Sequence, residues 1–355
     1  MKKSYFRPEI DAMAGYTPGE QPKMPDLVKL NTNENPYPPS PRVRAALAVF
    51  DAAELHRYPD PTADALRDAI AARNGVHREN VVAGNGSDDI LTMIFRAFTA
   101  PDRPVACPDP TYSLYPELAK MQGAPVIRIP LDESRGFALP ENPLRYAAGA
   151  NLLMIARPNA PTGNTFPLDA MRGICREFDG VVVFDEAYAD FADDNCMALA
   201  REFDNVLVSR TFSKSYALAG LRLGYAVGHA ELIAGLLKLK DSYNLDRLTQ
   251  TLGLAAYQDE AYLEKRCADV RGTRAVLDRE LKKIGFRVVP SSANFLFVSP
   301  PDGDGEGYFR KLRAEHVIVR YFKGDVTGKY VRITVGTPAE TERLLAVTRR
   351  IFEEA

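Results

Sequence analysis

Apolar segments in the middle of the chain end in side chains that could take part in chemistry. The run Val183-Phe184 leads directly into Asp185, and Val206–Ser209 is followed by Lys214 and then Arg222. A carboxylate after an apolar strand is costly unless a cation or a hydrogen-bond donor faces it, so we expect Asp185 to have such a partner. A lysine nearby can form a Schiff base with an aldehyde. These positions predict a ligand site that uses both an amine and a carboxylate.

Two further loops carry groups that bind anions or oxygen atoms. Residues Gly84–Asp89 follow a short strand and precede a helical pattern, where free N–H groups and the helix dipole favour a phosphate. This loop lacks the third glycine of a dinucleotide fingerprint, and a plain turn with a helix cap remains an open interpretation. Asn159 lies in a loop stiffened by Pro158 and Pro161, where its amide can donate to a ligand oxygen.

Pyridoxal 5′-phosphate needs all of these groups at once. Its aldehyde needs an amine, its pyridine nitrogen a carboxylate, its phenolic oxygen donors, and its phosphate N–H, hydroxyl and guanidinium groups. Lys214, Asp185, Asn159 and the segment Thr211–Arg222 offer a candidate for each need. Taken alone, Lys214 could be a solvated surface lysine and Asp185 a helix cap, but four motifs in order on consecutive strand ends favour the cofactor.

The elements that must position these groups alternate between short apolar runs and helical patterns. Runs such as Leu152–Ala156 are apolar on both faces, which is typical of strands buried between helices in a mainly parallel sheet. The runs in this part of the chain predict strands at Val81–Ala83, Pro104–Cys107, Val126–Ile129, Leu152–Ala156, Val181–Phe184, Val206–Ser209 and Leu223–Val227. Ligands bind at the carboxyl ends of such strands.

The pattern changes after Gly228 and predicts a second, smaller domain. Long helical stretches are followed by expected strands at Asn294–Val298, Val317–Arg320 and Tyr330–Val335 and by a helix near Ala339–Glu353. The proline-rich stretch from Tyr16 to Pro41 is expected to be an extended arm that belongs with this domain or with a neighbouring subunit. We therefore predict an arm and part of the small domain in residues 1–45, a large cofactor-binding domain in 46–245 and a small domain in 246–355.

The bulk properties favour a soluble enzyme of small molecules. The formal net charge of the 355 residues is -2, so no basic surface for nucleic acid is expected, and no apolar run is long enough to cross a membrane. The four cysteines and four histidines show no metal-binding spacing, so we expect no metal site. Unpaired cysteines and the absence of an apolar leader predict a cytoplasmic protein.

The segment Ser213–Gly224 closely resembles the lysine signature of the class II branch of the aspartate-aminotransferase-like, fold type I, pyridoxal-phosphate enzymes. The similarity covers almost the whole chain. It implies an α/β fold with a large domain built on a mainly parallel seven-stranded sheet, a smaller α+β carboxy-terminal domain, and a homodimer with shared active sites. It also implies a small-molecule amino donor and an oxo-acid acceptor.

The resemblance also assigns roles to individual residues. Lys214, Asp185 and Tyr188 are the implied catalytic residues: Lys214 carries the cofactor as a Schiff base, Asp185 pairs with the pyridine nitrogen, and Tyr188 and Asn159 hold the phenolic oxygen. The ring of Tyr112 is implied to stack on the cofactor. The groups implied to surround the cofactor phosphate are Gly86, Ser87, Thr211, Ser213, Arg222 and, from the other subunit, Tyr58. The residues implied to bind substrate are Arg332, at the α-carboxylate or the equivalent end, and Arg320 and Tyr16, toward a substrate phosphate.

Within the family, the segments Leu30–Pro36, Arg57–Asp60 and Val331–Gly336 are most similar to members that transfer the amino group of L-histidinol phosphate to 2-oxoglutarate. Threonine-phosphate decarboxylation and transamination of aromatic amino acids stay open as alternatives, and a non-catalytic cofactor-binding regulator is a remote one. Relatives usually have Asn-Pro-Asn-Asn-Pro-Thr-Gly where this chain has Arg157 and Ala160. We expect this departure to alter the rim of the pocket and to leave cofactor binding through Asn159 intact.

Overall fold

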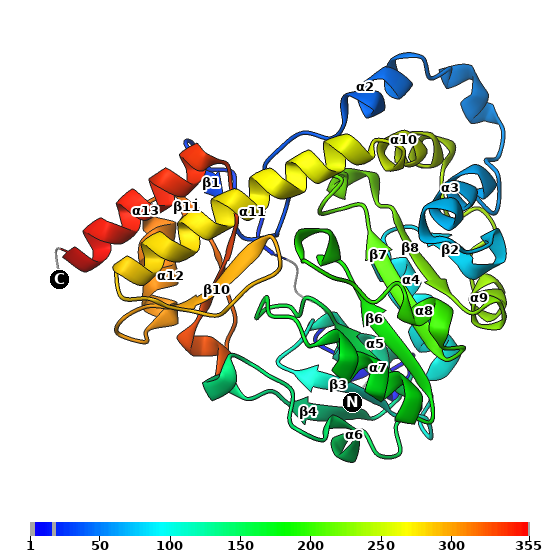
Figure 1. Ribbon diagram of the computed structural model, residues 1–355, viewed down its shortest axis with the longest axis horizontal. Coiled ribbons are helices and arrows are strands. Elements are labelled where there is room, and N and C mark those ends of the chain that lie inside the picture. Colours follow the sequence, from blue (N-terminus) through cyan, green and yellow to red (C-terminus); the bar gives the residue numbers. More distant parts are fainter. Residues whose placement is uncertain (1–3, 16–18, 354–355) are drawn as a thin grey trace.

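A twisted seven-stranded sheet forms the centre of the computed structural model, which describes residues 4–15 and 19–353 (Figure 1). The strand order is β2-β8-β7-β6-β5-β3-β4, and β8 alone is antiparallel to its neighbours. The strands are β2 (Val81–Gly84), β3 (Val105–Asp109), β4 (Val126–Pro130), β5 (Leu152–Ala156), β6 (Val181–Asp185), β7 (Val206–Thr211) and β8 (Gly224–Gly228). The predicted α/β class and the mainly parallel seven-stranded sheet are confirmed.

Helices cover both faces of this sheet because its central strands are apolar on both sides. Leu153 and Ile155 of β5 pack in one core cluster, whereas Leu152 and Met154 pack in a second cluster on the opposite face. The first face is covered by α3 (Asp64–Asn74), α7 (Leu168–Glu177), α8 (Leu199–Glu202) and α10 (Arg247–Tyr257). The second face is covered by α4 (Ser87–Phe98), α5 (Leu114–Met121) and α9 (Ala230–Leu237).

A smaller domain with its own apolar core lies beside the large sheet (Figure 1). Its antiparallel sheet has the order β12-β13-β10-β9, and β1 pairs in parallel with β11 next to it. The strands are β1 (Val28–Lys29), β9 (Arg287–Val288), β10 (Phe295–Ser299), β11 (Val317–Ile318), β12 (Arg320–Tyr321) and β13 (Val331–Thr334). The helices are α11 (Glu260–Lys283), α12 (Gly305–Ala314) and α13 (Pro338–Glu353). Because β1 pairs with β11, this part of the amino-terminal arm belongs with the small domain of its own chain.

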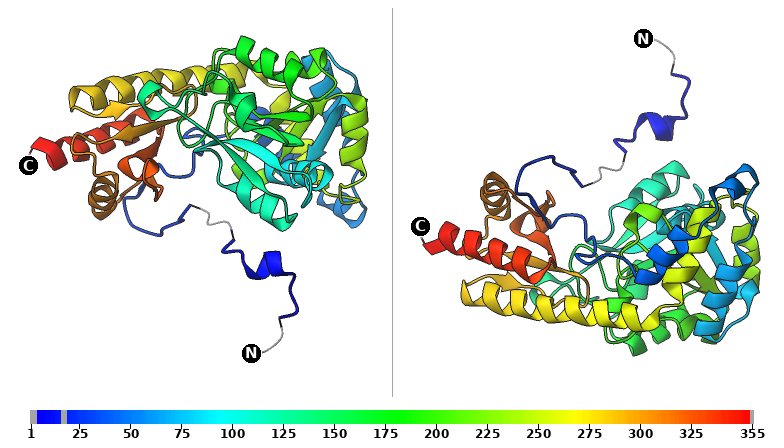
Figure 2. Two further views of the ribbon diagram at one scale, coloured as in Figure 1. Left: turned by 90° about the horizontal axis from the view of Figure 1, so that it is seen from below. Right: turned by 90° about the horizontal axis from the view of Figure 1, so that it is seen from above.

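Short helices make up the remaining elements. They are α1 (Pro8–Asp11), α2 (Pro41–Ala48), α6 (Pro143–Tyr146) and the 3₁₀ turns η1 (Ala52–His56), η2 (Arg78–Asn80), η3 (Glu133–Arg135), η4 (Ala189–Phe191), η5 (Ala219–Leu221) and η6 (Thr327–Lys329). The segment that carries α1 stands out from the side of the molecule in both views of Figure 2. Its Arg7 guanidinium donates to the carbonyl oxygen of Met121 at 2.7 Å.

The position of α10 bears on where the two domains meet. Leu252, Ala256 and Tyr257 of α10 pack in the core of the large domain, and the helix lies against α2 and α3. We therefore propose that the small domain begins after α10, which ends at Tyr257, and so about a dozen residues later than the predicted boundary at residue 246.

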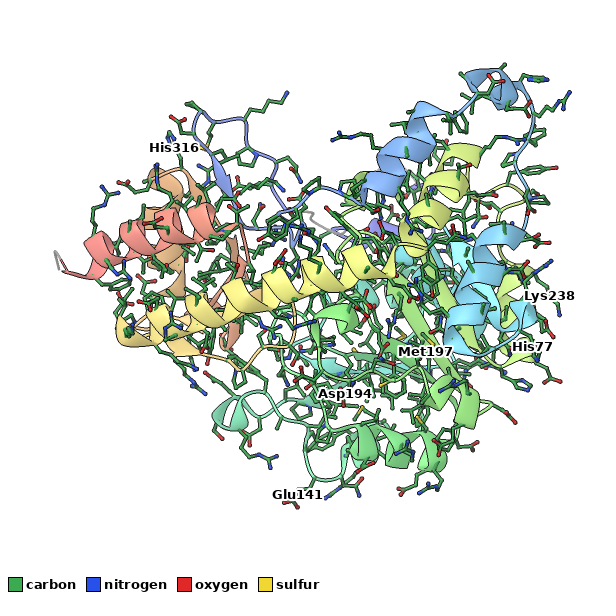
Figure 3. All side chains as sticks on the ribbon, turned by 45° about the horizontal axis from the view of Figure 1, so that its top comes forward. His77, Glu141, Asp194, Met197, Lys238 and His316 are labelled. Atoms are coloured by element: carbon green, nitrogen blue, oxygen red, sulfur yellow. The ribbon has the colours of Figure 1, made fainter. Side chains whose placement is uncertain are left out.

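The cysteines, the histidines and the apolar helices of the described chain show whether it could hold a disulfide, a metal site or a membrane span. All four cysteines are buried and unpaired. Among the described residues, no three His, Cys, Asp or Glu side chains gather as a metal site would require, and His77 and His316 lie far apart in Figure 3. Within the same part of the chain, no helix is long and apolar enough to cross a membrane.

Candidate active site

The carboxyl ends of β5, β6 and β7 meet at one edge of the large sheet and open into a cavity of about 270 Å³. Strand register aligns Ala156 with Asp185 and Asp185 with Ser209, so the loops that follow these strands lie side by side. The predicted site residues that line the cavity are Ser87, Tyr112, Asp185, Tyr188, Thr211, Ser213, Lys214, Arg222, Arg320 and Arg332. Residues far apart in the sequence thus share one pocket.

Asp185 lies at the bottom of this pocket, with 6% of the residue exposed. The Tyr115 hydroxyl donates to its Oδ2 at 2.7 Å, and the Ser209 hydroxyl makes a longer contact of 3.4 Å with Oδ1. Burial raises the pKa of Asp185 to about 6, against the opposing effect of the hydrogen bonds from Tyr115 and from the backbone of Ala187. The partner that we expected for this carboxylate is therefore mainly the Tyr115 hydroxyl, and not a cation.

Lys214 reaches the same cavity from the loop after β7. Its Nζ donates to the carbonyl oxygen of Thr32 at 2.9 Å. Burial and, to a smaller extent, the positive charge of Arg332 together lower the pKa of Lys214 to about 8, although the carboxylate of Glu34 opposes them. An amine with this pKa is a better nucleophile and base near neutral pH than an ordinary lysine.

Charged residues below the loop fix the backbone around Lys214. The Arg210 guanidinium donates to Glu186 Oε2 at 2.7 Å and to Asp190 Oδ1 at 2.9 Å. Asp190 in turn accepts from the Ser215 hydroxyl, and Asn35 Nδ2 donates to the carbonyl oxygens of Lys214 and Ser215. The side chain of Glu186 is fully buried, so this network is expected to be rigid.

The part of the cavity at the start of α4 is suited to a phosphate. Helix α4 begins at Ser87, and Arg222 donates to the Ser213 hydroxyl at 3.2 Å beside it. Gly86 has a φ of +85°, and a Cβ there would lie 2.6 Å from Arg222 Nη2. A Cβ on Gly224 would lie 2.5 Å from the backbone nitrogen of Ser87. The two glycines thus let the helix start, the guanidinium and β8 approach one another closely.

Asn159 is a predicted cofactor ligand that the structure does not bring to the cavity. It is fully buried and does not line the pocket. Both hydrogens of its amide are used by the protein: Nδ2 donates to the Pro110 carbonyl oxygen at 2.9 Å and to the Thr162 hydroxyl at 2.7 Å. Its Oδ1 accepts from the Thr111 hydroxyl at 2.9 Å. Asn159 therefore braces the wall of the pocket, contrary to its expected role, and Ala160 lines the cavity in its place.

Arg157 was also expected at the rim, and it points away from the cavity. Only 1% of it is exposed, and it does not line the pocket. Its Nη2 donates to Asp194 Oδ1 at 2.7 Å and its Nε to the carbonyl oxygen of Phe166 at 2.8 Å. Asp194 is labelled in Figure 3. At position 157 a buried guanidinium thus pairs with the half-exposed carboxylate of Asp194, away from the pocket surface, and the departure at Ala160 is the one that changes that surface.

Two tyrosines face the cavity between its ends. The Tyr188 hydroxyl accepts from Asn33 Nδ2 at 2.9 Å, and its ring packs edge-on against Phe295. The Tyr112 hydroxyl lies 3.4 Å from Asp88 Oδ1. The structure thus brings both predicted rings to the pocket.

The two predicted substrate arginines lie opposite each other on neighbouring strands. Arg320 of β12 pairs with Arg332 of β13, and both line the cavity. The guanidinium carbon of Arg332 lies 5.3 Å from the ring centres of Phe295 and Phe322, and its Nη2 donates to the Asn31 carbonyl oxygen at 2.9 Å. This places two positive charges at the mouth, where a phosphate or carboxylate could be held. Tyr16, the third predicted substrate residue, lies outside the described residues.

Tyr58 does not line the cavity of its own chain. It is 76% exposed, and its ring stacks on that of Tyr243 at 4.3 Å between ring centres. Its predicted role therefore requires another subunit.

Several residues of the site were not predicted from the sequence. Thr32 and Glu34 line the cavity through the amino-terminal arm, and Tyr115 reaches Asp185 from α5. The run around Glu34 resembles one subgroup of the family but does not by itself mark a cavity residue, and nothing local marks Tyr115 as a partner of a residue 70 positions away.

The chain matches the class I and II aminotransferases over residues 25–347. The chain belongs to this family. A histidinol-phosphate aminotransferase of Trichormus variabilis is 44% identical over 350 residues, which cover 98% of this chain and 99% of the relative. One of Dechloromonas aromatica is 45% identical over 95% of this chain and 96% of the relative. The crystal structure of histidinol-phosphate aminotransferase from Sinorhizobium meliloti, in complex with pyridoxal-5′-phosphate, has a TM-score of 0.88 and 23% identity, and the match covers 99% of each chain.

The geometry of the cavity fits pyridoxal phosphate as the cofactor of such an enzyme. The amine of Lys214, the buried carboxylate of Asp185, and the start of α4 with Arg222 all line this one cavity. The glycine positions leave room at the phosphate end that a side chain would fill. The donors thus match the aldehyde, the pyridine nitrogen and the phosphate of one molecule.

Proposed function

We propose that this protein transfers the amino group of L-histidinol phosphate to 2-oxoglutarate, giving imidazole-acetol phosphate and L-glutamate in histidine biosynthesis. The observation that carries this proposal is the similarity to histidinol-phosphate aminotransferases at about 44% identity over nearly the whole chain. The two arginines at the cavity mouth support it, because both half-reactions need a site for an anionic end of the substrate.

Different residues would serve as the base, the partner of the pyridine nitrogen and the group that orients the lysine. Bound pyridoxal phosphate supplies an aldehyde for the substrate amine and a ring that accepts electrons from the substrate carbon. Lys214 Nζ is placed to take the proton from the α-carbon of the amino donor, and its pKa of about 8 suits a base near neutral pH. Asp185 holds a proton at the pyridine nitrogen, which keeps the ring electron-withdrawing. The Thr32 carbonyl oxygen orients the Lys214 amine when it is free.

The remaining residues bind and orient. Ser87, Ser213 and Arg222 would hold the phosphate end of the cofactor, and the ring of Tyr112 would cover its face. Tyr188 would donate to the phenolic oxygen of the cofactor, because its hydroxyl already accepts a hydrogen bond from Asn33 Nδ2 and keeps its own hydrogen to give. With Asn159 turned into the wall and Ala160 at the surface, Tyr188 carries this contact without an asparagine of that loop.

The choice between amino transfer and decarboxylation is tested by product analysis. Purified protein with cofactor is incubated with 2-oxoglutarate and, in parallel, with L-histidinol phosphate, L-phenylalanine or L-threonine phosphate. We expect glutamate to form fastest with histidinol phosphate and no carbon dioxide to be released. Carbon dioxide from threonine phosphate, or a preference for phenylalanine, would replace this proposal with one of the two alternatives.

We further propose a homodimer in which each active site uses Tyr58 of the other subunit. Leu47, Val49 and Leu55 are exposed on the same stretch of chain as Tyr58, which leaves an apolar surface for a second copy. The four buried unpaired cysteines fit a reducing compartment, and we place the enzyme in the cytoplasm.

A mixing experiment tests the shared site. A Tyr58→Asp chain is refolded together with a Lys214→Ala chain, each of which is expected to be inactive as a homodimer. In the mixed dimer one site combines intact Lys214 with intact Tyr58, so activity should return. Mixed dimers without activity would show that Tyr58 acts within its own chain.

A further inference from the structure

Tyr115 is a buried side chain whose hydroxyl faces the central carboxylate of the site. It lies on α5, is fully buried, and donates to Asp185 Oδ2 at 2.7 Å. No other side chain of the described residues donates to Asp185 at a comparable distance, since the Ser209 contact is 3.4 Å. The hydroxyl lies within the protein interior and does not line the cavity.

This hydrogen bond acts on both the charge and the orientation of Asp185. Burial alone disfavours the charged carboxylate, and the donor from Tyr115 opposes this effect. Oδ2 is held by the short hydrogen bond from Tyr115, whereas the side-chain contact of Oδ1, with the Ser209 hydroxyl, is the longer one; the backbone of Ala187 adds a hydrogen bond to the same carboxylate. Of the two oxygens, Oδ1 is therefore the one less engaged by side chains. A hydrogen bond from a buried hydroxyl to a carboxylate is among the stronger kinds in proteins.

The ring of Tyr115 also contacts the tyrosine that faces the cavity. Tyr112 packs edge-on against it, with 5.6 Å between ring centres and 85° between ring planes, and Phe95 packs on its other side. One buried side chain therefore touches the residue expected to cover the cofactor ring and the residue expected to pair with its nitrogen.

We propose that Tyr115 is a positioning residue that keeps Asp185 ionised and fixes which of its oxygens meets the pyridine nitrogen of the cofactor. This inference rests on the proposed function, because it presupposes that Asp185 is the partner of that nitrogen. Tyr115 itself touches neither cofactor nor substrate.

The test is the affinity of the protein for pyridoxal phosphate, measured by titrating the cofactor-free protein and following cofactor absorbance. Tyr115→Phe removes the hydroxyl and keeps the ring that packs on Tyr112. Losing one hydrogen bond to a charged group corresponds to a dissociation constant raised about 10- to 100-fold. Tyr308→Phe is the matched control, because Tyr308 is also buried and shares a 2.7 Å hydrogen bond with Thr348 in the small domain. It should leave the affinity unchanged.

Two further readouts separate positioning from packing. In an Asp185→Asn background, Tyr115→Phe should change the affinity by less than about twofold, because the two residues act as one unit. As the pH is lowered, the affinity of the single variant should begin to fall at a higher pH than that of the native protein, since the carboxylate has lost a donor that stabilises its charged form. Both readouts are independent of turnover.

The outcomes distinguish this inference from the proposed function. If the native protein bound no pyridoxal phosphate, the proposed function itself would fail. Tight binding by the native protein together with equal affinities of Tyr115→Phe and Tyr308→Phe would overturn the inference alone. Simple additivity of the effects of Tyr115→Phe and Asp185→Asn would overturn it as well.

Discussion

The rate at which Lys214 captures its cofactor should depend on pH in a way set by the charges around it. The amine must be neutral to attack an aldehyde, and burial lowers its pKa from 10.5 to about 8. At one pH unit below this pKa about one amine in ten is neutral, whereas an ordinary lysine would have fewer than about one in a thousand. The rate should therefore rise about tenfold per pH unit up to about 8 and then level off.

Two charge-removing variants should move this midpoint in opposite directions. Arg332 lowers the pKa of Lys214, so Arg332→Gln should move the midpoint to higher pH. Glu34 raises the pKa of Lys214, so Glu34→Gln should move the midpoint to lower pH. Loss of Glu34 also leaves the positive charge of Lys29 without its ion-pair partner, and this charge should likewise lower the pKa of Lys214. Glu306→Gln, which removes a carboxylate paired with Arg310 on α12, is the control and should cause no shift.

The assay mixes cofactor-free protein with pyridoxal phosphate and follows the absorbance of the linked form across a pH series. A native midpoint near the ordinary lysine value would show that Lys214 is not buried as described. Shifts of the same sign in Arg332→Gln and Glu34→Gln would refute the electrostatic reasoning.

Three further substitutions test other parts of the site. Asp185→Asn should fold normally but lose about 100-fold or more in kcat, as expected when a strong electrostatic contact at a reacting centre is removed. Near-normal steady-state kinetics of this variant would show that Asp185 is not the partner of the pyridine nitrogen. Arg332→Lys keeps the charge but loses the forked guanidinium, so KM for histidinol phosphate should rise about tenfold or more, and unchanged kinetics would remove Arg332 from the substrate site. Arg210→Gln leaves the buried charge of Glu186 without its ion-pair partner and should lower the free energy of unfolding, measured by urea titration, by about 3–5 kcal/mol. A loss below about 1 kcal/mol would mean that the ion pair contributes no more than one on the surface.

The sequence predicted the central sheet well because most of its strands have five or six residues and the central ones are buried on both faces. The expected strand Leu152–Ala156 matches β5 at both ends, and Val181–Phe184 differs from β6 by one residue. Strands β1 and β9 were missed because each has only two residues, which is too short to show an alternating pattern. Their positions are set by pairing with β11 and β10.

The site was predictable where a residue's place follows from the end of a strand. Asp185 and Lys214 lie at the cavity because β6 and β7 direct them there. Asn159 also follows a strand, but its direction depends on Pro110 and Thr111, which no local pattern connects to it. The role of Tyr115 depends in the same way on how α5 packs against the sheet. Contacts across such distances depend on tertiary packing.

The most direct test of the account is to find which lysine holds the cofactor. The purified protein, saturated with pyridoxal phosphate, is reduced with borohydride, digested, and mapped by mass spectrometry. We predict a single modified peptide with the cofactor on Lys214, and no such peptide from Lys214→Ala. A cofactor fixed on any other lysine of the native protein would contradict it.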